Sequence, residues 1–338
     1  MKILISLLIL GIIIIIHELG HFLSAKFFKV PVSEFSIGMG PEVYTYEGDQ
    51  TKYSFRSIPI GGYVSIEGME LDDDREDGFN KKNPFIRFVI LFAGVFMNFL
   101  LAYLIIFGIT LNQGKITLNV NPVVGNTMEY SGNVFKKGDK IIKIDGNKVE
   151  KWIDIKKIVS EIKDKENTQK ILIERDGIDK LLEVKLYKGN DNDYYLGILP
   201  EYKIEKLSFT ESLKLSGKGF VHITKSIFKG FEMIISGKVS RKEISGPVGI
   251  VNIVGEASEQ GFLSIVSIMA ILSINIGIFN LLPFPALDGG RIIFVILEMF
   301  GIKVNKKMEE RVHKFGILIL FILIIFITTN DFFNLTGK

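Results

Sequence analysis

Three ionisable side chains stand within one helical turn near the N-terminus, in the sequence His17-Glu18-Leu19-Gly20-His21. On a helix, two histidines four positions apart project from one face, where their neutral imidazoles suit Zn²⁺. A glutamate beside the first histidine can take a proton from water at such a metal. Residues 3–16, which precede the motif, are almost entirely apolar. Ionisable groups in a membrane segment are costly, so the pattern favours a functional zinc site over residues that mark a helix end.

Composition excludes several kinds of site. The 338 residues contain no cysteine, which rules out disulfides, thiolate zinc ligands and a cysteine nucleophile. The net charge of +3 is too weak to indicate nucleic-acid binding. Only four histidines are present, so a third or fourth zinc ligand is expected to be a carboxylate.

Four apolar stretches are long enough to cross a bilayer at 1.5 Å per helical residue. The first could instead be a signal peptide, but no small-residue cleavage site follows it and apolar residues resume after His21. We expect transmembrane helices at 1–29, 86–111, 262–290 and 315–330. Asn98 lies inside the second span, where it could make a packing hydrogen bond or, as a candidate substrate-binding residue, belong to the site.

The segment 30–85 is polar overall and has strand character. Two short runs, 42–47 and 52–58, flank a turn-like break and predict a β-hairpin. Pro59, Gly61 and Gly62 follow, and they indicate an irregular edge strand whose backbone is free to pair with another chain.

Residues 112–203 change sharply in composition and read as a small α+β domain with a helix near 152–162. The segment 204–261 suits an amphipathic helix at the membrane surface, or equally a helix packed on the soluble domain. His222 there is expected to be interfacial.

A proline-broken stretch forms the end of the third span. Pro283 and Pro285 end the helix, and Asp288 comes next at membrane depth. Irregular backbone there must line a cavity or be buried in protein. His313 lies beside basic residues before the last span, and we interpret it as a residue at the level of the lipid headgroups.

The charge of the short loops predicts the orientation. The segment 291–314 carries an excess of Lys and Arg and is expected in the cytoplasm. Counting four spans, the termini and 112–262 are then outside and 30–85 is inside. The His17 and His21 pair falls toward the cytoplasmic half of the bilayer.

Together, the His17-to-His21 motif and the later stretch from Asn280 to Gly290 resemble the site-2 protease family of intramembrane zinc metalloproteases, specifically its bacterial RseP-like group. In this sequence the later stretch reads Asn-Leu-Leu-Pro-Phe-Pro-Ala-Leu-Asp-Gly-Gly. The resemblance implies that His17, His21 and Asp288 bind Zn²⁺, that Glu18 is the catalytic base and that Asn280 contacts substrate.

The resemblance extends over essentially the whole chain. Residues 112–203 are similar to a PDZ domain, through Lys137-Gly138-Asp139 and Asp145-Gly146, and 52–64 to a membrane-re-entrant hairpin. The fold class expected is therefore an α-helical polytopic membrane protein of about four transmembrane helices, with a membrane-associated β-hairpin and one inserted α+β PDZ-like domain. Two departures stand out: 93–99 lacks the family's proline, and Asn133-Val134-Phe135 replaces its Ala-Gly-Leu.

The function expected is that of a zinc metalloendopeptidase of regulated intramembrane proteolysis in the bacterial inner membrane, with the PDZ-like domain outside. By resemblance, its partners are the lipid bilayer and single-span proteins already trimmed by another protease, such as anti-sigma factors or remnant signal peptides. An unwound substrate could pair with the edge strand at Gly61 and Gly62. The alternatives are a membrane metal transporter and a non-proteolytic PDZ-bearing scaffold.

Overall fold

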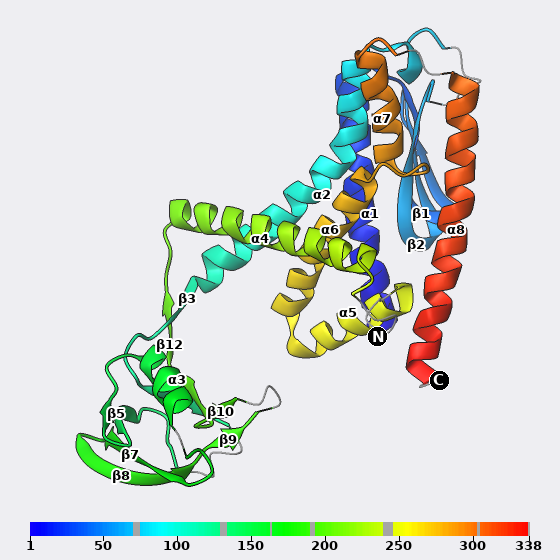
Figure 1. Cartoon of the computed structure of the whole chain (residues 1–338). Coiled ribbons are helices and arrows are strands. Elements are labelled where there is room, and N and C mark those ends of the chain that lie inside the picture. Colours follow the sequence, from blue (N-terminus) through cyan, green and yellow to red (C-terminus); the bar gives the residue numbers. More distant parts are fainter. Residues whose placement is uncertain are drawn as a thin grey trace. The chain divides into compact units, whose positions relative to one another are not determined.

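The apolar stretches are helical in the computed structural model, which describes residues 1–69, 75–128, 134–162, 164–189, 193–238, 246–302 and 305–336. Within those ranges, four helices are long and apolar enough to cross a membrane, as predicted. They are α1 (Lys2–Phe27), α2 (Pro84–Gln113), α6 (Phe262–Leu281) and α8 (Lys306–Thr336) (Figure 1). The segment predicted only as basic, 291–314, is largely helical. Helix α7 (Asp288–Met299) covers its first part, and α8 starts at Lys306 rather than at 315.

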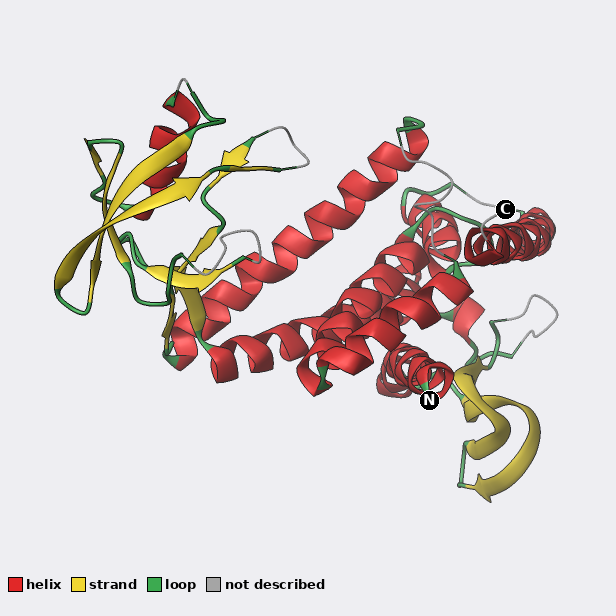
Figure 2. Cartoon of the chain, turned by 90° about the horizontal axis from the view of Figure 1, so that it is seen from below, coloured by secondary structure: helices red, strands yellow, loops and turns green. Residues whose placement is uncertain are grey.

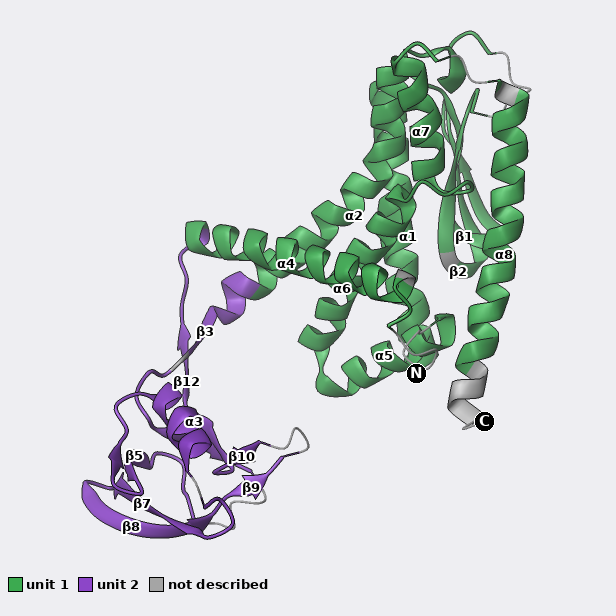
Figure 3. Ribbon diagram, in the orientation of Figure 1, with its two compact units in different colours: residues 1–109, 210–338 green, residues 110–209 purple. Residues whose placement is uncertain are grey.

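The chain forms two compact units. Unit 1 comprises residues 1–109 and 210–338, and unit 2 comprises 110–209 (Figure 3). Unit 1 contains the four long helices except for the last turn of α2, which lies in unit 2. Unit 2 covers nearly the same residues as the predicted inserted domain.

Helix α4 (Phe209–Ile235) packs on the long helices of unit 1 (Figure 1). Its Phe220 ring meets Phe99 of α2 edge-on, with centroids 5.9 Å apart. Its Phe231 ring contacts Phe279 of α6 at 5.1 Å. Part of the apolar face of the amphipathic helix predicted at 204–261 is therefore covered by α2 and α6, while Leu213, Val221 and Phe228 stay exposed. A position at the membrane surface stays a prediction.

Helix α8 is attached at its far end by a buried carboxylate. Asp331 accepts hydrogen bonds from the backbone N–H groups of Gly246, Val248 and Gly249, at 2.8, 3.0 and 3.0 Å. These groups open helix α5 (Pro247–Gln260), whose N-terminal N–H groups have no partner within the helix. The side chain of Asp331 in α8 thus caps the N-terminus of α5, although the two lie more than eighty residues apart in sequence.

The hairpin predicted in 30–85 is present and larger than expected. Strands β1 (Val32–Glu47) and β2 (Lys52–Ile66) pair around a turn in which the N–H of Gly48 bonds to the carbonyl of Thr51. Both strands bend, so the start of β1 pairs with the start of β2 as well as with its end, and Phe35 has both Tyr53 and Val64 as partners. The apolar side of this sheet packs on α1, where Phe22 contacts Phe35 with ring centroids 5.1 Å apart.

Unit 2 contains a four-stranded sheet with the order β6 (Asn147–Lys148), β5 (Lys140–Ile144), β7 (Thr168–Arg175) and β8 (Ile178–Lys185). Figure 2 colours all strands of the chain yellow. Helix α3 (Trp152–Glu161) buries Ile155 and Val159 in the same apolar core as the sheet. The smaller strand pairs are β3 (Lys115–Leu118) with β12 (Tyr202–Glu205), β4 (Val124–Thr127) with β11 (Ile198–Pro200), and β9 (Tyr187–Lys188) with β10 (Tyr194–Tyr195).

A buried ion pair holds the loop at which unit 2 departs from the family pattern. Arg175 donates two hydrogen bonds of 2.7 Å to Asp139 and one of 2.9 Å to the carbonyl of Val134. Burial alone would raise the pKa of Asp139, but hydrogen bonds from Arg175 and from the Lys136 N–H outweigh it and lower the pKa. Asn133 lies outside the described residues.

Arg175→Leu should therefore leave the Asp139 carboxylate buried without its cation and destabilise unit 2 by about 3 kcal/mol. Trp152 is the chain's single tryptophan, so its fluorescence in the intact protein reports urea unfolding of this unit. Because the folded pKa of Asp139 is lowered, its contribution is complete above pH of about 4 and is lost as the pH falls further. Lys140→Leu, which removes an exposed pair with Glu174, is the control and should change little. An unchanged midpoint in Arg175→Leu would contradict this role.

Candidate metal centre and active site

The two histidines of the first motif lie one turn apart on a continuous stretch of α1. The side chains of His17 and His21 are both buried, and their rings meet edge-on with centroids 4.8 Å apart. Their Nε2 atoms are 3.1 Å apart and face the same point. The helical spacing therefore brings two imidazole nitrogens together, as the sequence predicted.

Asp288 reaches this point from the other end of the chain. Helix α6 ends at Leu281, an irregular loop follows, and Asp288 is the first residue of α7 (Asp288–Met299). Its Oδ2 atom lies 2.9 Å from Nε2 of His17 and 3.3 Å from Nε2 of His21. The irregular loop thus delivers a carboxylate to the histidine pair.

The three atoms have the spacing of metal ligands. In tetrahedral coordination with bonds of about 2.0–2.1 Å, neighbouring ligand atoms are about 3.3 Å apart. The observed separations of 2.9, 3.1 and 3.3 Å are close to that value. Two imidazoles and one carboxylate also form the donor set of catalytic zinc sites, which leave one position open. His17, His21 and Asp288 therefore fit a zinc ion.

The outer nitrogens of both rings contact groups that fix their orientation. Nδ1 of His21 lies 2.9 Å from the carbonyl of Ile90 in α2 and donates its hydrogen there, which leaves Nε2 unprotonated. Nδ1 of His17 lies 3.3 Å from the side-chain amide of Asn98, also in α2.

Asn98 therefore contacts the site rather than only packing between helices. Its Nδ2 faces His17, while its buried Oδ1 has no hydrogen-bond partner among the described residues. The two ends of an amide are exchangeable assignments, and exchanging them lets Oδ1 accept the Nδ1–H of His17. The backbone carbonyl of Asn98 accepts a 2.8 Å bond from Ser273 of α6, which fixes its place.

A cavity of about 390 Å³ opens at this centre. It is lined by the three candidate ligands together with Ile14, Glu18, Val64, Ile66, Met69, Ile276, Asn280, Ala286, Leu287 and Arg291. Val64 and Ile66, at the end of β2, line the same cavity as Glu18, so this strand borders the candidate base. Glu18 and Asn280 are thus both brought to the site that the sequence predicted for them.

Gly61 and Gly62 do not line this cavity, which is reached instead by Val64 and Ile66 of the same strand. A Cβ on Gly62 would lie 2.4 Å from the carbonyl of Ser36, so this glycine permits close strand pairing. Gly61 adopts a left-handed φ of +75° beside Ile14 of α1. Their role in substrate binding stays a prediction.

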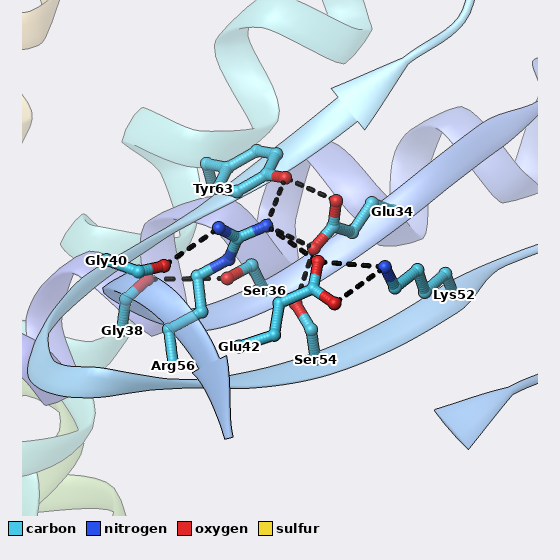
Figure 4. Close-up of polar contacts among 9 residues, drawn as sticks. All are labelled: Glu34, Ser36, Gly38, Gly40, Glu42, Lys52, Ser54, Arg56 and Tyr63. Carbon is cyan, nitrogen blue, oxygen red and sulfur yellow. Dashed lines mark hydrogen bonds and ion pairs between the residues drawn. The ribbon is translucent and has the colours of Figure 1, made fainter. Parts of the chain in front are cut away.

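A polar network keeps the hairpin that carries Val64 in shape (Figure 4). Arg56 donates to Glu34 at 2.8 Å and to the hydroxyl of Tyr63 at 2.9 Å. Tyr63 and Ser54 also donate to Glu34. Burial alone would raise the pKa of Glu34, but the hydrogen bonds from Ser54, Tyr63 and Arg56 lower it to about 2. Glu34 is therefore ionised at neutral pH and joins the two ends of the hairpin.

Two glycines let α1 and α2 approach each other at the centre. A Cβ on Gly20 would lie 2.3 Å from the carbonyl of Ala93. A Cβ on Gly94 would lie 2.4 Å from Nε2 of His21 and 2.8 Å from Nε2 of His17. In the sequence, Gly94 stands out only as part of the 93–99 stretch that lacks the family's proline. Helix α2 continues through this position without a break.

Comparisons with known proteins agree with this geometry. The family model described as Peptidase family M50 matches residues 5–323. A relative from Fusobacterium nucleatum subsp. nucleatum is 51% identical over 99% of both chains, and one from Clostridium acetobutylicum is 36% identical over 98% of this chain and 97% of its own. A third, from Campylobacter jejuni subsp. jejuni, is 34% identical over 98% of this chain and 94% of its own. Each is named "Putative zinc metalloprotease".

Among solved structures, the PDZ domain of the SdrC-like protein from Listeria monocytogenes is 19% identical, with a TM-score of 0.22. That similarity covers 25% of this chain and 90% of the Listeria chain.

Gly94→Ala places a methyl group against both ring nitrogens and should lower zinc affinity by about tenfold to a hundredfold, the effect of disturbing the surroundings of a metal ligand. Zinc content after dialysis against a graded chelator measures this. Gly108→Ala is the matched control on the same helix, because a Cβ there meets no atom within 4 Å. Equal zinc retention in the two variants would contradict the close approach of α2 to the centre.

Proposed function

Because the chain belongs to peptidase family M50 and is a zinc metalloprotease, we propose that it cuts peptide bonds inside the transmembrane segments of other proteins. The observation that carries the proposal is the convergence of His17, His21 and Asp288 on one point in a bundle of apolar helices. Ionisable residues are costly inside membrane segments, so a metal site formed by such segments favours a reaction that takes place within the membrane.

The chemistry divides between the metal and the protein. A zinc ion held by these three ligands supplies a Lewis acid that makes water a better nucleophile at neutral pH. Glu18 lines the same cavity and is next in sequence to a ligand, so we assign it the proton transfers. It accepts the proton of the attacking water and later donates it to the amine that leaves.

The remaining lining residues suit a role in holding an extended substrate. The amide of Asn280 can donate a hydrogen bond to the carbonyl that is attacked, where negative charge develops. A helical substrate hides its peptide bonds and must unwind first. The end of β2, at Val64 and Ile66, borders the cavity and offers backbone groups for pairing with the unwound stretch.

The two alternatives lack a use for Glu18. A metal transporter needs ligands for its cargo but no base beside them, and a scaffold needs neither. Measuring zinc flux and peptide cleavage in the same liposomes separates the three functions.

We place the enzyme in the bacterial inner membrane, with its centre toward the cytoplasmic half and unit 2 outside. The basic residues near the start of α8 support this orientation through the positive-inside rule. The substrates proposed are single-span proteins, such as anti-sigma factors or remnant signal peptides, that another protease has already trimmed.

Glu18→Gln should abolish most cleavage while zinc stays bound. The amide keeps the shape of the side chain but cannot accept a proton, so the rate should fall by about 10²–10⁴-fold. Mass spectrometry of a transmembrane peptide in liposomes measures cleavage, and elemental analysis measures zinc. Glu256→Gln changes an exposed carboxylate on α5 and serves as the control. Near-normal turnover by Glu18→Gln would remove Glu18 from the mechanism.

Unit 2 should limit the size of the extracytoplasmic part that a substrate can keep. A folded insert between α2 and α4 admits a short stub more readily than a whole domain. Replacing residues 115–200 by a flexible linker should then let untrimmed substrates be cut. A deleted enzyme that binds zinc and cuts the trimmed substrate, yet still rejects the full-length one, would refute this role.

A further inference from the structure

The loop that precedes Asp288 adopts a backbone conformation that its residues do not favour. Ala286 has a φ of +88°, although its Cβ disfavours the left-handed region. Asp288 follows two residues later and is the only one of the three candidate ligands that α1 does not carry. A conformation of this kind persists only where the surroundings hold it.

Helix α8 contacts this loop at two points. Nδ1 of His313 accepts the backbone N–H of Ala286 at 3.2 Å. One turn further, Gly316 packs against Pro285 so closely that a Cβ there would lie 2.3 Å from the Cβ of Pro285 and 2.4 Å from its carbonyl oxygen. The side chain of His313 therefore faces the loop, a contact that the sequence did not predict. Its level relative to the lipid headgroups stays a prediction.

Gly289 and Gly290, which follow Asp288, are packed just as tightly, so a shift of the loop also shifts the start of α7. A Cβ on Gly289 would lie 2.2 Å from the carbonyl oxygen of Leu282, and one on Gly290 would lie 2.4 Å from that of Phe284. Loop and first turn of α7 therefore move together.

We propose that His313 is a positioning residue: by accepting the Ala286 N–H it holds the strained loop in place and thereby sets Asp288 against His17 and His21. This rests on the proposed function, because it assigns Asp288 to the metal. Helix α8, which supplies no candidate ligand, thus becomes part of the centre. A movement of α8 away from Pro285 and Ala286 weakens the metal site.

His313→Leu tests the proposal in the full-length protein, because it removes the acceptor. Zinc affinity, measured by chelator competition, and kcat should each fall by about tenfold, the size of one lost hydrogen bond, while KM changes little. His313→Asn retains an acceptor oxygen near the position of Nδ1 and should stay within about threefold of wild type.

The decisive comparison is the double variant. Glycine adopts a φ of +88° without strain, so the loop no longer needs the hydrogen bond to His313 to hold its conformation. Adding Ala286→Gly to His313→Leu should therefore return zinc affinity and kcat to within about threefold of wild type, since a threefold difference is smaller than the effect of one lost hydrogen bond. Ala286→Gly alone should be nearly normal. A loss that came only from packing of α8 would not be repaired by a change in the loop.

Three outcomes would overturn the proposal: wild-type zinc affinity and kcat in His313→Leu, no recovery in the double variant, or loss of function in His313→Asn as large as in His313→Leu. If His313→Leu does not fold, Gly316→Ala carries the test, and a folded Gly316→Ala protein with normal zinc affinity would also overturn it. The zinc measurement separates this result from the proposed function, which fails instead if wild type cleaves no transmembrane substrate.

Discussion

A carboxylate and two imidazoles converge between apolar helices, and this cluster constrains the rest of unit 1. Burying an unpaired carboxylate costs several kcal/mol, and two unprotonated Nε2 atoms at 3.1 Å cannot bond to each other. A cation shared by the three groups removes both costs. The cluster is therefore stable only if α1, α2 and α7 are held in close register around it.

That register depends on residues that neither bind the metal nor take part in the reaction. Gly94 lets α2 pass beside the histidines, and Gly289 and Gly290 let α7 start directly against the end of α6. A buried pair between Arg87 and Glu298 joins α2 to α7. The same packing places Ile90 and Asn98 of α2 where they orient the two rings. Small residues and ring partners thus decide whether the ligands meet.

Local sequence patterns predicted the chemistry and the number of spans, because both are written in spacing and hydropathy. The His17 and His21 pair follows from helical periodicity, and the hairpin turn follows from the break near Gly48. Asp288 was assigned through a family resemblance, since no pattern links residues 271 positions apart. The contacts of Asn98, Gly94 and His313 could not be predicted, because each depends on how two distant helices cross. The same limit applies to β1, whose second pairing arises from a bend.

The most direct test of the central claim is zinc-edge X-ray absorption on the purified protein in detergent. The account predicts one zinc per chain, bound by two imidazole nitrogens and by oxygen at about 2.0–2.1 Å, with the oxygen contribution altered in Asp288→Ala. A first coordination shell with fewer than two imidazoles, or one that Asp288→Ala leaves unchanged, would contradict it.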